Sequence, residues 1–160
     1  MRKDKLLFLL TFFVIFLSLV SCDKNRVFET NIEMPSYEWN KDSVLLFHVD
    51  IVDTISSHNI YLNVRNTSQY AYQNLFVFLQ TTSPTGLSLR DTLECYLADD
   101  RGKWLGSGWG DIYDNRFIYK RNIRFPVSGN YTFKVIQGMR SNQLKYITDV
   151  GIRIEKSENQ

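Results

Sequence analysis

The sequence predicts an all-β protein: an antiparallel two-sheet β-sandwich, immunoglobulin-like or jelly-roll-like, that follows a cleaved signal peptide and a short tether. Three observations support this fold class. Apolar residues recur at every second position in several short segments, as they do in half-buried strands. After the N-terminal region, no segment shows a convincing amphipathic helical period. Clusters of turn-forming residues separate the segments, at 83–86, 99–102 and 128–130.

The predicted strands begin near residue 45. In SVLLFHVDIVD one face carries Leu45, Phe47, Val49 and Ile51, and HNIYLNVRN alternates in the same way. NLFVFLQTT is apolar on both faces, which predicts a central strand covered on both sides. Further alternating segments are TLECYL, RFIYKRNIRF, YTFKVIQ and VGIRIEK. The predicted sandwich domain therefore covers residues 41–156.

The segments on either side of this domain have a different character. Residues 1–21 have the layout of a secretory signal peptide, with basic residues first, an apolar run at 6–20, and the small Ser21 at the cleavage point. The run is shorter than the roughly 20 apolar residues that a membrane-spanning helix needs. Residues 22–40 are mostly polar and carry Pro35, so we expect a modified N-terminus and a tether there. Residues 157–160 are predicted to be a C-terminal tail.

The stretch Leu-Val-Ser-Cys at 19–22 resembles the bacterial lipobox. This resemblance implies that Cys22 receives a diacylglyceryl group, becomes the first residue of the mature protein and is N-acylated. Several acyl chains would then hold the protein to a membrane, at about 0.8 kcal/mol per buried methylene. The alternative is an ordinary secreted protein with a disulfide between Cys22 and Cys95. If Cys22 is acylated, we expect Cys95 to be a small buried hydrophobic residue.

The charge balance of the mature chain excludes one class of partner. The full sequence has 19 basic and 17 acidic residues, and residues 1–21 hold three of the basic and one of the acidic ones. Cleavage therefore leaves a chain of zero net charge, which gives no electrostatic reason to expect nucleic acid binding.

The sequence holds no assembled catalytic, cofactor or metal motif. His48 and Asp50 share one face of a predicted strand, but no motif ties a nucleophile to them. The glycine cluster GSGWGD has Asp111 where a dinucleotide fingerprint requires its third glycine. Asp99, Asp100, Asp111 and Asp114 could offer oxygen ligands to calcium, but their spacing fits no EF-hand, and turn formation explains them better. The sequence thus predicts no enzyme, no cofactor and no metal site.

The segment 97–114, LADDRGKWLGSGWGDIYD, concentrates aromatic residues and glycines in one predicted loop. Its Trp104, Trp109 and Tyr113 could form a packed plug over one end of the sandwich, or an exposed surface for interaction. Glycines on both sides of Trp109 favour exposure of that ring, whereas Lys103 and Leu105 give Trp104 a better setting for packing.

Four stretches together resemble a known family: SCDKNRVFE, RNTSQYAYQNLFVFL, DTLECYLADDRGKWLGSGWGD and FPVSGNYTFKVIQGMRSNQLKYITDVGIRIEK. They are similar to the gliding-motility lipoproteins of the GldH family of the Bacteroidetes. The resemblance runs from the lipobox to near the C-terminus and depends on the order of several segments. It implies an envelope lipoprotein required for gliding, a process linked to the type IX secretion system, and it supplies no catalytic residues.

We therefore expect a membrane-anchored, non-enzymatic accessory component of the gliding and secretion machinery that works through contacts with other envelope proteins. The alternative is a lipid-anchored glycan-binding module in which Trp104, Trp109 and Tyr113 stack on sugar rings. In this phylum, surface export is associated with acidic residues directly after the acylated cysteine. Here Asp23 stands alone before Lys24 and Arg26, which favours a domain that faces the periplasm.

Overall fold

The structure, a computed structural model, describes residues 23–157, and the predicted signal peptide, Cys22 and the last three residues lie outside that range. Its strands are β1 (Arg26–Glu33), β2 (Glu38–Asn40), β3 (Leu45–Ile51), β4 (His58–Thr67), β5 (Asn74–Thr82), β6 (Ser88–Tyr96), β7 (Ile112–Ile123), β8 (Gly129–Gln137), β9 (Gln143–Lys145) and β10 (Ile147–Lys156). A short 3-10 turn, η1 (Pro35–Tyr37), precedes β2. Among the described residues there is no helix of the length and apolarity that crossing a bilayer requires.

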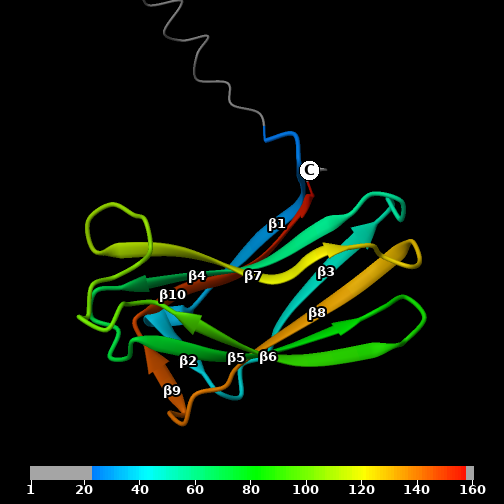
Figure 1. Ribbon diagram of the computed structural model, residues 1–160. Helices are drawn as coiled ribbons and strands as arrows, with labels where there is room; N and C mark the ends of the chain where they lie inside the picture. The colour runs from blue at the N-terminus through cyan, green and yellow to red at the C-terminus, as the bar shows by residue number, and fades with distance from the viewer. Residues whose placement is uncertain (1–22, 158–160) are drawn as a thin grey trace, which may run out of the picture.

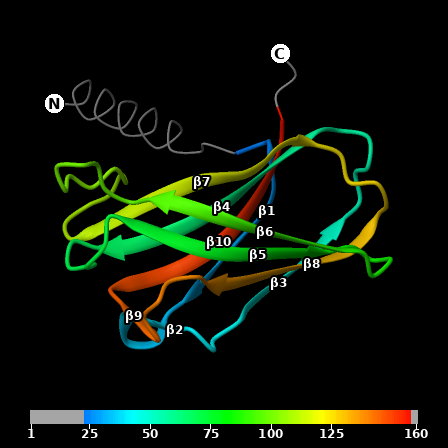
Figure 2. The same ribbon diagram turned by 60° about the horizontal axis from the view of Figure 1, so that its bottom comes forward.

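The strands form two four-stranded antiparallel sheets with the orders β1-β10-β4-β7 and β3-β8-β5-β6, and β2 pairs with β9 in a separate ribbon. Figures 1 and 2 show the two sheets as layers, with the ribbon at one end. The predicted all-β sandwich is therefore confirmed. If the short β2 and β9 are set aside, the remaining eight strands have the order of a jelly roll, in which successive strands repeatedly cross between the sheets.

The core lies between the sheets because apolar side chains alternate along each strand. In β3 the burial alternates strictly, with Leu45, Phe47, Val49 and Ile51 inside and the residues between them exposed. The facing sheet contributes Ile60, Leu62 and Val64 from β4, and β10 adds Val150, Ile152 and Ile154. Cys95 is also fully buried, as expected for a small hydrophobic residue, and its thiol is free.

Residues 23–40 are part of the fold, contrary to the predicted tether. β1 pairs with β10 from Arg26 to Glu33, and Trp39 is completely buried, with its indole N–H donating to the Ser43 carbonyl at 3.2 Å. Sequence analysis missed this strand because its outer face is polar and only Phe28 and Ile32 of its inner face pack against the core. An edge strand of this kind shows little apolar alternation.

For β5, the sequence predicted a central strand that is covered on both faces, and only the first part is confirmed. It lies inside its sheet, between β8 and β6, as a central strand should. Only its inner face is fully buried, however, while Phe76 and Phe78 on the outer face are half-buried. Long side chains cover that face instead of a further layer: the Arg90 guanidinium lies 4.8 Å from the Phe78 ring centre, and the Met139 sulfur accepts the Phe76 N–H at 3.3 Å.

The sandwich has two ends that matter for function. The terminal end holds residues 23–26, the loop 52–57, the loop 124–128 and residues 156–157, which converge because β10 ends where β1 and β4 begin. The distal end holds the loop 68–73, the loop 97–111 and the β2–β9 ribbon. In Figure 1 the start of β1 and the C-terminus lie at the top of the sandwich, and the long loop between β6 and β7 lies at the far left.

Candidate functional site

The loop 97–111 links the edge strands of the two sheets at the distal end. Backbone hydrogen bonds attach its start to the loop 68–73, because the carbonyl of Gln73 accepts the N–H groups of Leu97 and Ala98 at 2.8 and 3.0 Å. A tight turn follows, in which the Asp99 carboxylate accepts the N–H groups of Arg101 and Lys103, both at 2.9 Å. The loop is therefore an ordered structure rather than a loose connection.

The second half of the loop presents Trp109. Ser107 and Asp114 exchange backbone hydrogen bonds of 3.0 and 2.6 Å, which close the base of a turn around the tryptophan. A side chain on Gly108 would overlap the carbonyl oxygen of Ile112, and Gly110 has a left-handed backbone with φ of 69°. Both glycines are thus required by this backbone path. The path leaves the Trp109 side chain 94% exposed.

The three aromatic residues predicted as one surface are separated by the structure. Trp104 and Tyr113 pack on each other with ring centres 5.5 Å apart, and both are half-buried. Trp104 also packs against the core, so it serves as the plug that sequence analysis considered. Trp109 stands apart from them in solvent. Each interpretation of the loop therefore fits one of its two tryptophans.

A buried amide supports the loop from below. The side-chain Nδ2 of Asn115 donates to the Val64 carbonyl at 3.3 Å, to Asn66 Oδ1 at 3.0 Å and to the Tyr113 carbonyl at 3.2 Å. A Cβ on Gly106 would lie 2.8 Å from Asn115 Oδ1, so the loop backbone sits directly on this amide. Sequence analysis missed Asn115, because only the register of β4 against β7 brings these groups together.

A groove runs beside the Trp109 turn. It has a volume of about 580 Å³, and its wall includes Tyr96, Leu105, Arg116 and Phe117. The side chains of Tyr96 and Leu105 are each 57% exposed, so the groove wall carries apolar area that is open to solvent. Trp109, Tyr96 and Leu105, which we call the distal aromatic surface, thus place one projecting ring and exposed apolar area at the same end of the sandwich.

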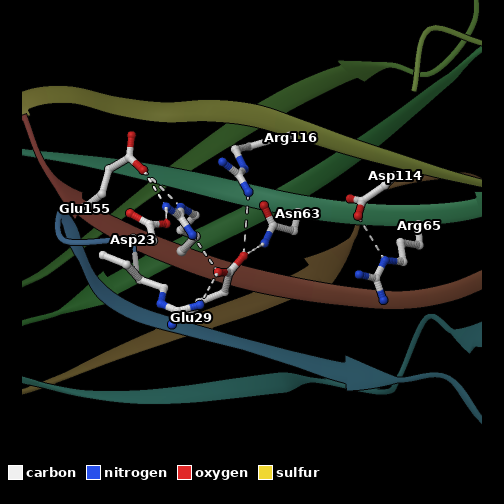
Figure 3. A network of polar contacts seen from close by, with 9 residues as sticks. Asp23, Glu29, Asn63, Arg65, Asp114, Arg116 and Glu155 are labelled. Atoms are coloured by element: carbon white, nitrogen blue, oxygen red, sulfur yellow. Dashed lines mark hydrogen bonds and ion pairs between the residues drawn. The ribbon is translucent and has the colours of Figure 1, made fainter. Parts of the chain in front are cut away.

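A second polar feature fixes the start of the described chain. Arg153 on β10 is 6% exposed and bonds three carboxylates: Asp23, Glu29 at 2.6 Å and Glu155 at 2.9 Å. Asn63 on β4 donates to Glu29 at 3.0 Å. Figure 3 shows Asp23, Glu29 and Glu155 converging on this point, with Arg65 and Asp114 forming a separate pair farther along the sheet. We call the first group the Arg153 cluster.

The electrostatics of the Arg153 cluster follow from its charges. Burial raises the pKa of Glu29, but the hydrogen bond from Arg153 and its positive charge lower it more, so the pKa lies below the ordinary value of 4.5. The hydrogen bond from Arg153 likewise lowers the pKa of Asp23. Both carboxylates are therefore ionised at neutral pH and hold residues 23–29 against β10.

Most of the residues weighed for catalysis and metal binding have local partners. His48 and Asp50 lie on the exposed face of β3, and His48 Nδ1 is 3.2 Å from the hydroxyl of Thr132. Asp99 caps its own turn, Asp111 accepts from Ser68, and Asp114 pairs with Arg65. Residues 23–157 contain no cluster of histidine, cysteine and acidic side chains that could hold a metal ion.

Comparison with known proteins agrees with the resemblance found in the sequence. The family model of the GldH lipoprotein matches residues 26–154. A gliding motility lipoprotein GldH homolog of Christiangramia forsetii is 39% identical to this chain. The alignment covers 99% of this chain and 100% of the relative. The gliding motility lipoprotein GldH of Flavobacterium johnsoniae is 35% identical over 88% of this chain and 91% of that protein.

Among solved structures, the VP2 subviral particle of infectious bursal disease virus matches with a TM-score of 0.38 and 14% identity. The match covers 85% of this chain but 33% of the viral chain, and a likeness this weak supports no inference. The family model and the two relatives, in contrast, extend over nearly all of the sequence. The chain therefore belongs to the GldH lipoprotein family, whose members are membrane-anchored gliding-motility lipoproteins of the cell envelope.

Proposed function

We propose that this protein is a non-enzymatic accessory component of the gliding and type IX secretion machinery, and that its distal aromatic surface binds another envelope protein. The observation that carries the proposal is Trp109, 94% exposed on a turn whose backbone is fixed by Gly108 and Gly110. Tryptophan is enriched among the residues that dominate binding energy at interfaces. A ring held on an ordered turn also loses little conformational entropy when it binds.

The proposed anchor is Cys22, with a diacylglyceryl group on its sulfur and an acyl chain on its amino group. The Arg153 cluster supports this assignment because it places Asp23, the neighbour of Cys22, at the terminal end of the sandwich. Cys95 lies at the end of β6, at the distal end, where it pairs with Leu75 in the sheet register. A disulfide requires Cα atoms within about 7 Å of each other, so the alternative Cys22–Cys95 bridge would require β1 to leave its sheet.

The two proposed sites lie at opposite ends of the molecule. Strands such as β7, with 12 residues, run between the ends at about 3.3 Å per residue, which separates the sites by roughly 30 to 40 Å. The anchored protein would thus present Trp109 away from the bilayer. We infer that the domain faces the periplasm, because Asp23 is followed by Lys24 and Arg26 rather than by further acidic residues.

The contact surface is tested by measuring gliding or secretion, and protein stability, in three alanine variants. We expect Trp109→Ala to reduce gliding or secretion while changing stability by under about 0.5 kcal/mol, since its ring is in solvent. Trp104→Ala should lower the melting temperature, because that ring packs on the core. Leu87→Ala, a 76% exposed apolar residue on the hairpin between β5 and β6, is the matched control and should alter neither property.

A photo-activated crosslinker placed at Leu105, in the same distal aromatic surface, identifies the partner. Pull-down from native cells should recover an envelope protein in the wild-type background, and the yield should fall in the Trp109→Ala protein. Full motility and an unchanged crosslinking pattern in Trp109→Ala would remove the distal aromatic surface from the proposal.

The anchor has its own test. Cys22→Ala should release the protein from membranes and abolish incorporation of labelled palmitate. Continued membrane fractionation with palmitate incorporation in this variant would show that acylation occurs elsewhere. Protease treatment of intact cells tests the orientation, because a periplasmic domain stays protected until the outer membrane is opened.

A glycan-binding function is the second candidate, favoured by the same exposed indole, since an aromatic face is a general platform for sugar rings. Of the three rings predicted to stack on sugars, the structure leaves only Trp109 almost fully exposed, because Trp104 and Tyr113 pack on each other. A glycan array with the purified protein distinguishes the candidates: saturable binding that Trp109→Ala abolishes would favour the glycan module over the protein contact.

A further inference from the structure

The loop 52–57, between β3 and β4, exposes two large apolar side chains. Val52 is 82% exposed and Ile55 is 83% exposed. The loop is nevertheless ordered, because the Asp53 carboxylate accepts the N–H groups of Ile55 and Ser56 at 3.0 and 2.9 Å. The same carboxylate pairs with Lys156 Nζ at 2.7 Å. The backbone is thus held in a shape that turns Val52 and Ile55 into solvent.

This loop lies beside the first described residues of the chain. The N–H of Lys156 donates to the Asn25 carbonyl, and the N–H of Ser157 donates to the Ser57 carbonyl, both at 2.8 Å. Residues 25 and 57 are therefore joined through two neighbouring residues of β10 and its extension. A cavity of about 420 Å³ is lined by Ile55, Arg124 and Asn25, which places the apolar loop within a few residues of Asp23.

Two cations near this loop are free to bind an external anion. Arg121 and Arg124 are exposed, and neither forms an ion pair within residues 23–157. Arg121 lines a larger polar cavity of about 790 Å³ at the same end, together with Asp23 and Lys156. Three other arginines, on the outer face of the β1-β10-β4-β7 sheet, are paired with carboxylates and so differ from Arg121 and Arg124. They are Arg65, Arg116 and Arg153.

We propose that the loop 52–57, with Arg121 and Arg124, docks on the headgroup region of the bilayer that holds Cys22. The inference rests on the proposed acylation of Cys22, which brings lipid to within one residue of Asp23. Exposed valine and isoleucine beside unpaired arginines are suited to the boundary between acyl chains and anionic headgroups. Docking gives the domain a fixed orientation, with the terminal end on the membrane and Trp109 pointing away.

The test uses the full lipoprotein reconstituted in vesicles of phosphatidylethanolamine and phosphatidylglycerol. An environment-sensitive thiol-reactive fluorophore is attached in Ile55→Cys and, separately, in Val52→Cys, and lipids carrying quenchers report contact with the bilayer. Trp109→Cys is the matched control at the distal end. The wild-type protein controls for labelling, since Cys95 is buried and an acylated Cys22 has no free thiol.

We expect the lipid-borne quenchers to reduce fluorescence at positions 52 and 55 and to leave position 109 unaffected. Replacing Arg121 and Arg124 with glutamine should lower the ratio of docked to undocked protein by about fivefold for each arginine removed on anionic vesicles. Arg140→Gln, which removes an exposed arginine at the distal end, should leave the ratio unchanged.

The outcomes separate the docking from the anchor. If the wild-type protein takes up no label and floats with the vesicles, but positions 52 and 55 stay unquenched, the docking is wrong and the anchor stands. Equal quenching at position 109 would mean that the domain has no fixed orientation, which also overturns the docking. Labelling of the wild-type protein with loss of flotation would remove the anchor, and the docking with it.

Discussion

Arg153 and Glu29 face each other across the β10–β1 ladder, and Arg153 Nη1 lies 2.6 Å from Glu29 Oε2. The two residues are 124 positions apart in the chain, so this contact joins the first and last strands within one sheet. Because β1 begins at Arg26, close behind the proposed lipidation site at Cys22, the same contact ties the domain to its proposed anchor. The first prediction concerns its contribution to stability.

Arg153→Gln should lower the free energy of unfolding by about 2 to 4 kcal/mol. Removing one partner of a buried ion pair typically costs 3 to 5 kcal/mol, and the partial exposure of the carboxylates here reduces that figure. The variant removes the ion pair of Glu155 and leaves Glu29 with only its longer ion pairs to Arg26 and Arg116. Arg116→Gln is the control, because this exposed arginine lies 3.8 Å from Glu29 and should contribute under about 1 kcal/mol. Urea denaturation of both variants measures the difference, and equal losses would contradict the assigned role.

Acid should weaken the fold through Glu29 and Asp91, whose pKa values are both lowered. The pKa of Asp91 falls because Lys120 and Tyr119 donate hydrogen bonds to it. When the pKa of a carboxyl is lower in the folded protein, the unfolded chain binds more protons at acidic pH. The stability that these carboxylates contribute is therefore complete above the ordinary carboxyl pKa, and it is lost as the pH falls through their pKa values in the folded protein. Urea denaturation at a series of acidic pH values should show the decline, and Arg153→Gln should make it shallower.

His58 should add a second decline at milder pH. Burial lowers its pKa from 6.5, an effect that Lys156 strengthens and Asp53 opposes. Since a depressed histidine pKa favours proton uptake by the unfolded chain, stability should decrease as the pH falls below 6.5. We expect His58→Leu to remove this component, whereas His48→Gln, at an exposed position, should retain it. An identical pH slope in wild-type and His58→Leu proteins would refute the assignment.

Gly108→Ala should disrupt the presentation of Trp109. The added methyl group would overlap the carbonyl of Ile112, so the turn must move, at a cost of about 1 to 3 kcal/mol. Crosslinking through position 105 should fall accordingly. Gly86→Ala is the control, since that hairpin glycine has φ of 85° and open space around it. It should cost about 1 kcal/mol through backbone strain and leave crosslinking intact.

Cys95 should be unreactive in the folded protein. Burial, reinforced by the nearby charge of Glu94, raises the pKa of its thiol to about 12, and the side chain has no exposed area. A thiol reagent should therefore react only after urea unfolds the chain. Unfolding should then expose one reactive thiol per chain if Cys22 is acylated and two if it is not, because the sequence has only these two cysteines. Rapid labelling of the native protein at Cys95 would contradict its burial.

Most of the sandwich could be predicted because its strands bury one face, and β3 shows how directly burial follows from alternation. β1 could not be found this way, because most of its side chains are polar and the segment therefore resembles a solvent-exposed tether. Its pairing with β10 is what makes it a strand. The contrast between Trp104 and Trp109 was predictable from their neighbours, because glycine permits backbone paths that project a ring into solvent.

The supporting residues of the site were beyond sequence analysis. Arg153 and Asn115 owe their roles to register, which pairs Arg153 with Glu29 and sets Asn115 opposite Val64. A single alternating segment contains no information on which distant strand will lie beside it. The loop 52–57 was overlooked for a different reason. Its two apolar residues, Val52 and Ile55, are too few to show a period, and only the structure places the loop beside residue 25, near the proposed anchor.

The pairing of β1 with β10 also has a mechanical consequence. A load between the lipid at the start of β1 and a partner at the opposite end of the sandwich would pull nearly along the strand axis. Interstrand hydrogen bonds of an antiparallel ladder run perpendicular to the strands, so this pull would shear the bonds between Arg26 and Glu33 together rather than peel them one by one. The geometry suits the proposed role, in which the domain stays folded between a membrane anchor and a protein partner.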